Sequence, residues 1–170
     1  QPYYQPFQTP QGGSDMGTFA IVPPGFPTNK TGCTTPSGIA HDSVNLKLTL
    51  RTPTNANSLA FDHSFFSAEY PEFACSFYND MWVALLTTAA PGIANNRDIV
   101  FDAQGTPGSV NLNFFDRCIA GPTGCFGTPG FNFCSGGKGE LAGTGYDGAD
   151  SPCGPASSIG GGTGWLTSEA

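Results

Sequence analysis

The sequence predicts an all-β protein: an antiparallel, jelly-roll-like β-sandwich with long Gly/Pro-rich, disulfide-bonded loops. Several short stretches alternate apolar and polar residues, which is typical of strands with one buried face. The chain has 24 Gly and 15 Pro, which supply turns between these stretches. No stretch has the apolar period of an amphipathic helix. Together these features favour a sandwich of short strands.

The chain length of 170 residues suits one domain. Residues 1–14 lack apolar periodicity and are rich in Pro and Gln, so we expect an extended N-terminal arm or linker. A docking peptide that uses Tyr3, Tyr4 and Phe7 is the alternative. Residues 15–170 are expected to form the single sandwich domain.

The first expected strand covers Thr18–Val22, and Pro23 and Pro24 end it. Residues 41–51 form the clearest amphipathic strand, because apolar and polar side chains alternate with period two. We therefore expect one buried and one solvent-facing side. The apolar residues are Val44, Leu46, Leu48 and Leu50, and the polar residues are Asn45, Lys47, Thr49 and Arg51.

The next expected strand is Leu59–Phe66, in which His63 lies between Phe61 and Phe65 on one face and is predicted to be a core histidine. Met81–Thr88 is apolar on both faces, as in a central strand. The remaining expected strands are Asp98–Asp102, Ser109–Phe115, Phe131–Phe133, Glu140–Ala142 and one that starts at Trp165.

The net charge is −7, with only six Lys and Arg residues. These cations form no cluster, so the sequence argues against a nucleic-acid partner, which needs grouped cations. The acidity suits a hard cation such as calcium. No apolar stretch reaches the roughly 18 residues of a transmembrane helix.

The six Cys residues have no spacing that indicates zinc, so three disulfides are expected. Disulfides imply an oxidising compartment, hence an extracellular or outer-surface location. The expected pairs are Cys33–Cys75, Cys118–Cys125 across a Gly-Pro-Thr-Gly turn, and Cys134–Cys153 across a Gly-rich loop.

The connection after the Leu59–Phe66 strand holds four oxygen-bearing side chains. A calcium ion takes six to eight oxygen ligands, and the expected side-chain ligands are Glu69, Glu72, Asn79 and Asp80. The alternative is structural: Glu69 and Asp80 hydrogen-bond loop amides, and Glu72 is a solvated side chain.

Catalysis is not expected. Carboxylate pairs such as those of glycosidases arise by chance in an acidic loop, and the chain has neither a Gly-x-Ser-x-Gly elbow nor a Walker loop. Trp82 and Trp165 are candidates for stacking on sugar rings. Burial in the core is the alternative for both.

Several separated motifs resemble the bacterial choice-of-anchor L domain. They are FDHSFFSAEYPEF at residues 61–73, FYND at 77–80, ELAGTGYD at 140–147 and GGTGWLT at 161–167. The resemblance spans residues 36–170. His63 departs from the family's aromatic or apolar residue, and Tyr78 departs from its plain Phe-Asn-Asp.

The resemblance implies a secreted or surface protein without known enzymatic activity. Family members continue with an Asp-rich segment and a last strand, before which this chain stops, so the resemblance implies an incomplete sandwich whose unpaired edges invite strand addition. We expect a non-catalytic, calcium-stabilised structural or adhesion module, a subunit of an extracellular assembly or filament. Its expected partners are other protein chains, joined by strand addition or self-assembly. The alternative is a carbohydrate-binding module with glycan ligands.

Overall fold

A computed structural model describes residues 19–21, 31–33, 39–41, 43–112, 114–123, 130–147 and 160–170. The expected N-terminal arm, residues 1–14, lies outside this part. The described chain is built from short strands and one 3-10 turn, so the all-β class is confirmed. The elements are β1 (Phe19–Ile21), β2 (Ile39–His41), β3 (Ala60–His63), β4 (Phe66–Ser67), β5 (Leu85–Leu86), β6 (Arg97–Asp98), β7 (Gly121–Thr123), β8 (Gly130–Asn132), η1 (Gly139–Leu141), β9 (Gly161–Gly162) and β10 (Leu166–Glu169).

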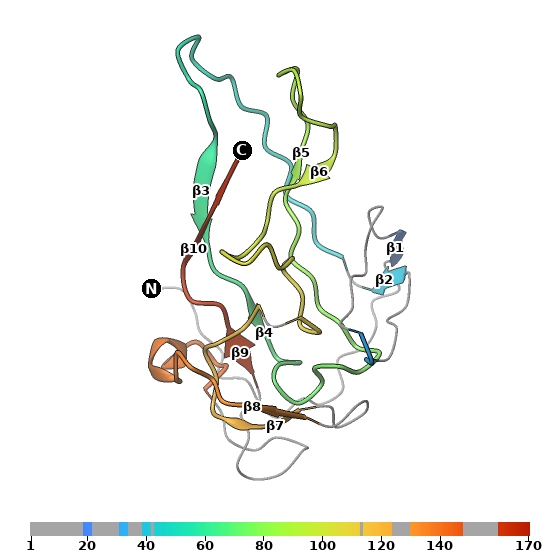
Figure 1. The fold of residues 1–170 in the computed structure, drawn as a ribbon, viewed down its shortest axis with the longest axis vertical. Coiled ribbons are helices and arrows are strands. Elements are labelled where there is room, and N and C mark those ends of the chain that lie inside the picture. The colour runs from blue at the N-terminus through green and yellow to red at the C-terminus, as the bar shows by residue number, and fades with distance from the viewer. Residues whose placement is uncertain are drawn as a thin grey trace.

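The strands pair antiparallel in separate two-stranded sheets: β1 with β2, β3 with β10, β4 with β9, β5 with β6 and β7 with β8. Antiparallel pairing was expected, and each of these five strand pairs of the described chain is antiparallel. β3 and β10 run side by side, with β5 and β6 across from them and β7 and β8 at the opposite end (Figure 1). The longest ladder thus joins distant parts of the sequence.

Two of the expected strands form close to where the alternating pattern places them. Thr18–Val22 contains β1, and Leu59–Phe66 contains β3 and the first residue of β4. The second strand breaks at Phe65, whose backbone N–H donates to the Thr163 hydroxyl at 3.0 Å instead of to a strand partner. The strand expected to start at Trp165 forms β10 from Leu166 onward.

Other expected strands are wrong or shorter than predicted. Ser109–Phe115 meets Met81 at one bridge and then turns, with the Leu112 N–H donating to the Ser109 carbonyl. Its alternating pattern reflects burial of Val110 and Phe114 without a strand. Glu140 and Leu141 lie in the 3-10 turn η1, and Ala142 follows it, so no strand forms here.

Met81–Thr88 is not a fully buried central strand either. Only β5 forms within it, and the side chains of Trp82 and Leu85 are partly exposed. Asp98–Asp102 contributes one residue to β6 and a bridge from Phe101 to Pro107. Phe131–Phe133 overlaps β8, whose partner β7 includes the Gly-Pro-Thr stretch that the sequence predicts to be a turn.

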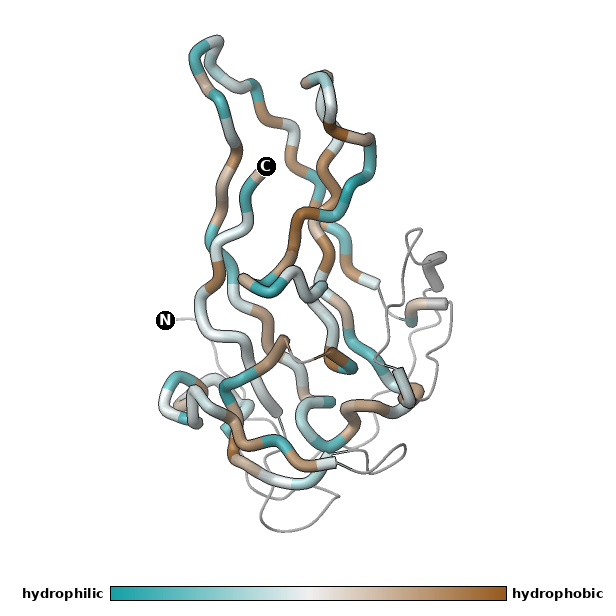
Figure 2. Tube along the Cα trace, in the orientation of Figure 1, coloured by the Kyte–Doolittle hydropathy of each residue, from teal (hydrophilic) through white to brown (hydrophobic). Residues whose placement is uncertain are grey.

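The clearest expected strand is wrong in the structure: residues 43–51 have no strand partner within the described chain. This segment runs from β2 toward the hairpin that precedes β3 (Figure 1). Apolar and polar residues alternate along it (Figure 2). Residues 44–51 are exposed on both faces. The exposed fractions are Val44 95%, Leu46 83%, Leu48 69% and Leu50 62%.

A small aromatic-rich core lies between the β3–β10 pair and the loops that face it. Its buried members are Tyr70, Val100, Val110, Phe114, Phe115, Cys118 and Cys134. Phe61, Phe65 and Leu166 pack against this cluster from β3, the β3–β4 junction and β10. Phe61 and Phe65 therefore lie on the core side that the sequence predicts. The helical content of the described residues includes no segment long and apolar enough to cross a membrane.

Candidate functional site

The acidic loop between β4 and Met81 is anchored in the core by Tyr70. This side chain is buried, and its hydroxyl donates to the Phe115 carbonyl at 3.1 Å. Its ring stacks on Phe115 with centroids 4.6 Å apart. The following Tyr70–Pro71 peptide bond is cis. The anchor fixes the loop's first turn and holds Glu69 at the edge of the core.

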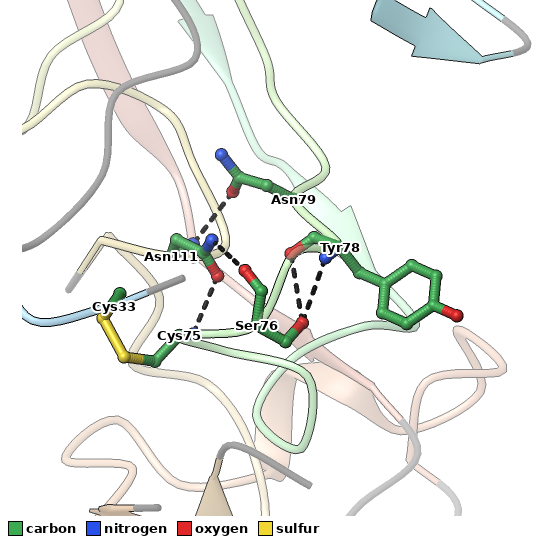
Figure 3. Close-up of a disulfide and its surroundings, with 6 residues drawn as sticks. All are labelled: Cys33, Cys75, Ser76, Tyr78, Asn79 and Asn111. Atoms are coloured by element: carbon green, nitrogen blue, oxygen red, sulfur yellow. Dashed lines mark hydrogen bonds between the residues drawn. A yellow bond between two sulfur atoms is a disulfide. The ribbon is translucent and has the colours of Figure 1, made fainter. Parts of the chain in front are cut away.

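The far end of the loop is held by Asn111, which bridges two of its backbone groups. The Cys75 N–H donates to Asn111 Oδ1 at 2.7 Å, and Asn111 Nδ2 donates to the Ser76 carbonyl at 2.8 Å (Figure 3). Cys75 has a positive φ of 66° and forms a disulfide with Cys33. The expected Cys33–Cys75 pair is therefore confirmed. Sequence reasoning missed Asn111, because the alternating pattern of residues 109–115 places it on the polar face of an expected strand.

Asn79, an expected calcium ligand, directs its carbonyl oxygen into the same network. Its Oδ1 accepts hydrogen bonds from the Ser109 hydroxyl at 2.6 Å and from the Asn111 N–H at 3.0 Å. The nearby Val110 N–H donates to the Asp80 carbonyl at 3.0 Å. These bonds tie the second half of the loop to residues 109–111, and Asn79 has a structural role in this arrangement.

Glu69 and Asp80 come together, as the sequence predicts. The Asp80 N–H donates to Glu69 Oε2 at 3.0 Å. Ser67 lies between them: its hydroxyl donates to Asp80 Oδ2 at 2.5 Å and accepts from the Glu69 N–H at 3.0 Å. Ser67 is buried in β4 and carries no sequence signal for this role. The expected structural use of both acids, hydrogen bonding within the loop, is thus present for Glu69.

Burial makes ionisation of the Glu69–Asp80 pair unfavourable. Burial, followed by the nearby Asp80 charge, raises the pKa of Glu69 to about 7. Burial also raises the pKa of Asp80, although its hydrogen bond from Ser67 partly offsets this. The pair is therefore suited to hold either one proton or one cation near neutral pH.

The expected four-residue calcium site is not assembled as a set. Glu72 is only 1% exposed, so the prediction of a solvated side chain is wrong. Glu72 lies in the turn that follows Tyr70, and its side chain is buried there. Among the described residues, no group of three or more His, Cys, Asp or Glu side chains is placed to hold a metal ion. Glu69 and Asp80 are the side-chain ligands that a cation would find together.

A second disulfide differs from the prediction. Cys118 pairs with Cys134, with Cα atoms 5.2 Å apart, so the expected Cys118–Cys125 and Cys134–Cys153 pairs are wrong. The β7–β8 ladder closes the chain between Cys118 and Cys134 and brings them together. Cys125 and Cys153 lie outside the described residues.

His63 is a buried core residue, as predicted. Its Nε2 lies 2.9 Å from the Ser168 hydroxyl, which joins β3 to β10 through side chains as well as backbone. Burial lowers the pKa of His63, while the Asp62 charge opposes this effect. Both residues of this Ser–His contact are buried.

The two tryptophans have different surroundings. Trp82 is partly exposed and its ring lies 6.0 Å from the His63 ring. Trp165 is 75% exposed, so the alternative of core burial is wrong for this residue. It lines a cleft of about 400 Å³ beside β10, together with Phe101, Asp102 and Glu169. An exposed indole beside carboxylates is compatible with the expected stacking on a sugar ring.

Comparison of the chain with protein families, with curated proteins and with solved structures finds no match. The resemblance to the choice-of-anchor L domain therefore stays a prediction. The function must be argued from the acidic loop, the uncovered segment 43–51 and the cleft at Trp165.

Proposed function

We propose that the chain is a non-catalytic structural or adhesion module of an extracellular assembly, which other protein chains complete by strand addition. The observation that carries this proposal is the uncovered segment 43–51. Its apolar side chains alternate like those of a half-buried strand, yet all four are more than 60% exposed. An extended edge with unpaired peptide groups is a template for another strand.

The remainder of the described structure supports a structural, non-catalytic role. Two disulfides and the Asn111 network hold loops in fixed positions around a small core. Disulfides are typical of extracellular proteins, which need such cross-links where the core is small. We assign Glu69 and Asp80 a stabilising role within the loop, with calcium as the cation that would relieve their mutual repulsion.

Hydrogen exchange tests the proposed strand addition. Amides of residues 44–51 should exchange fast in the dispersed protein and become protected in assembled material from the natural source. The β3 amides serve as the internal control, because their ladder with β10 forms within one chain. Fast exchange of residues 44–51 in both samples would contradict the proposal.

A carbohydrate-binding module is the second candidate, favoured by the exposure of Trp165 in its cleft. Stacking on an indole ring needs such an accessible face. A glycan array followed by titration of Trp165→Ala tests it, with Trp82→Ala as the matched control outside this cleft. Binding that survives Trp165→Ala, or an array without hits, argues against this candidate.

A further inference from the structure

The unpaired backbone and the side chains of segment 43–51 restrict which strand could pair with it. No backbone hydrogen bond joins it to another segment in the described chain. It has two cations, Lys47 and Arg51, and no acid. A partner strand must therefore present apolar residues to one face and must keep cations away from Lys47 and Arg51 on the other face.

Only certain antiparallel registers satisfy these conditions when the partner strand is the same segment of a second copy. Registers that pair odd with even positions place apolar residues opposite polar ones, because side chains alternate between faces. Among the others, centring on Lys47 opposes two lysines, and centring on Thr49 opposes Lys47 to Arg51. Like charges directly opposite each other are destabilising.

Centring on Leu48 avoids both conflicts. Lys47 then lies opposite Thr49 of the second copy, and Asn45 lies opposite Arg51. On the other face Leu46 lies opposite Leu50, and Leu48 meets its own counterpart. Every apolar side chain except Val44, which meets Thr52, has an apolar neighbour. The ladder then runs from Val44 to Thr52 and stops short of Pro53, which cannot donate a hydrogen bond. Centring on Asn45 or Leu46 would place Leu48 or Leu50, respectively, opposite the charged Asp42. Centring on Leu50 would place Lys47 opposite Pro53.

We infer that residues 44–52 of this chain pair in antiparallel fashion with the same residues of a second copy, with a two-fold axis at Leu48. This inference rests on the proposed function and names the partner of the same edge. The pairing is isologous, so it closes into a dimer and satisfies the same peptide groups on both copies. One shared strand pair is smaller than the roughly 1,200 Å² of a standard interface, so we expect a weak dimer.

The salt dependence of the association distinguishes a second copy of this chain from an acidic partner strand. In the dimer Lys47 and Arg51 of both copies share one face, and their repulsion is screened as ionic strength rises. The dissociation constant of the dimer should therefore fall by a factor of about two to five when the salt concentration increases from roughly 0.05 to 0.5 M. An acidic partner strand would be released by the same change.

Sedimentation equilibrium of the full chain at about 10 to 500 μM tests the inference. We expect a monomer–dimer equilibrium that Leu46→Lys/Leu50→Lys weakens at least tenfold. Phe133→Lys is the matched control, because Phe133 is also 81% exposed but lies after β8. Since all three side chains are exposed, unfolding should not complicate the comparison, and the thermal unfolding of each variant checks this.

Disulfide trapping tests the register. Paired strand residues have Cα atoms about 4.5 to 5.5 Å apart, which suits a disulfide. Leu48→Cys should therefore form a covalent dimer under mild oxidation. Asn45→Cys should not, because two Asn45 positions would lie roughly 20 Å apart along the ladder.

The inference is overturned by a wild-type monomer at all concentrations, by a dimer that Leu46→Lys/Leu50→Lys leaves unchanged, or by equal trapping at positions 45 and 48. The proposed function survives those results when residues 44–51 are protected in the natural assembly, since the partner is then a different chain. It fails when these amides are unprotected there.

Discussion

The Nε2 atom of His63 lies 2.9 Å from the Oγ atom of Ser168, although the two residues are 105 positions apart in the sequence. Their hydrogen bond lies across the β3–β10 ladder, in which Phe61 is paired with Ser168 and His63 with Leu166. The contact therefore reports on whether the C-terminal strand is docked. Because one partner titrates, docking should depend on pH.

Acidification should weaken the β3–β10 pair. Burial lowers the pKa of folded His63 below its ordinary 6.5, so the unfolded chain takes up a proton at a higher pH than the folded chain. The free energy of unfolding from this group therefore falls as pH drops below about 6.5. Denaturant unfolding at pH 7.5 and 5.0 measures it, and His63→Gln should reduce the difference.

The wild-type chain in the same two buffers is the reference for this pH dependence. A pH dependence that persists unchanged in His63→Gln contradicts the assignment to His63.

The Glu69–Asp80 pair should act in the opposite direction in metal-free buffer. The pKa of folded Glu69 is raised to about 7, so the folded chain holds a proton that the unfolded chain has already lost. Stability from this group therefore decreases as pH rises through 7, by roughly 1 to 3 kcal/mol between pH 5 and 8. Glu69→Gln should reduce that decrease and leave the part that comes from buried Asp80.

Calcium should restore the stability lost at pH 8, because a bound cation replaces the proton between the carboxylates. Thermal unfolding with calcium or with EDTA measures the effect in the wild type and in Glu69→Gln. Glu169→Gln, at the exposed end of β10, is the control. An equal response to calcium in the wild type and Glu69→Gln would place the ion elsewhere.

Asn111→Asp should destabilise the fold by about 2 to 4 kcal/mol, despite its nearly identical shape. Asn111 is buried, accepts from the Cys75 N–H and donates to the Ser76 carbonyl. A carboxylate cannot make the second bond and brings a charge into the interior. Denaturant unfolding measures the loss, with the exposed Asn45→Asp as control. Equal stability of both variants contradicts the role of Asn111.

Gly161→Ala should cost about 1 to 3 kcal/mol, because an added Cβ would lie 2.6 Å from the Tyr70 ring. That ring is stacked on Phe115 and hydrogen-bonded, so it has little room to move. In contrast, Gly139 has no atom within 4 Å of an added Cβ. Gly139→Ala should leave the melting temperature nearly unchanged. A loss of the same size at both positions would indicate a general effect of side-chain addition.

The sequence by itself determined the all-β class, the burial of His63 and the meeting of Glu69 with Asp80. These features follow from local signals: alternation of side chains, turn residues, and acids close together in one loop. The pattern of residues 109–115 shows the limit of such signals, because alternation also arises where a turn buries Val110 and Phe114.

Only the tertiary structure decided which partners these segments find. Ser168, Asn111 and Cys134 reach their partners through contacts between residues far apart in the sequence, and local patterns do not specify those contacts. Segment 43–51 has the strongest strand pattern, yet no strand of the described chain pairs with it. Strand propensity sets the face that a segment can bury, whereas burial itself requires a second surface.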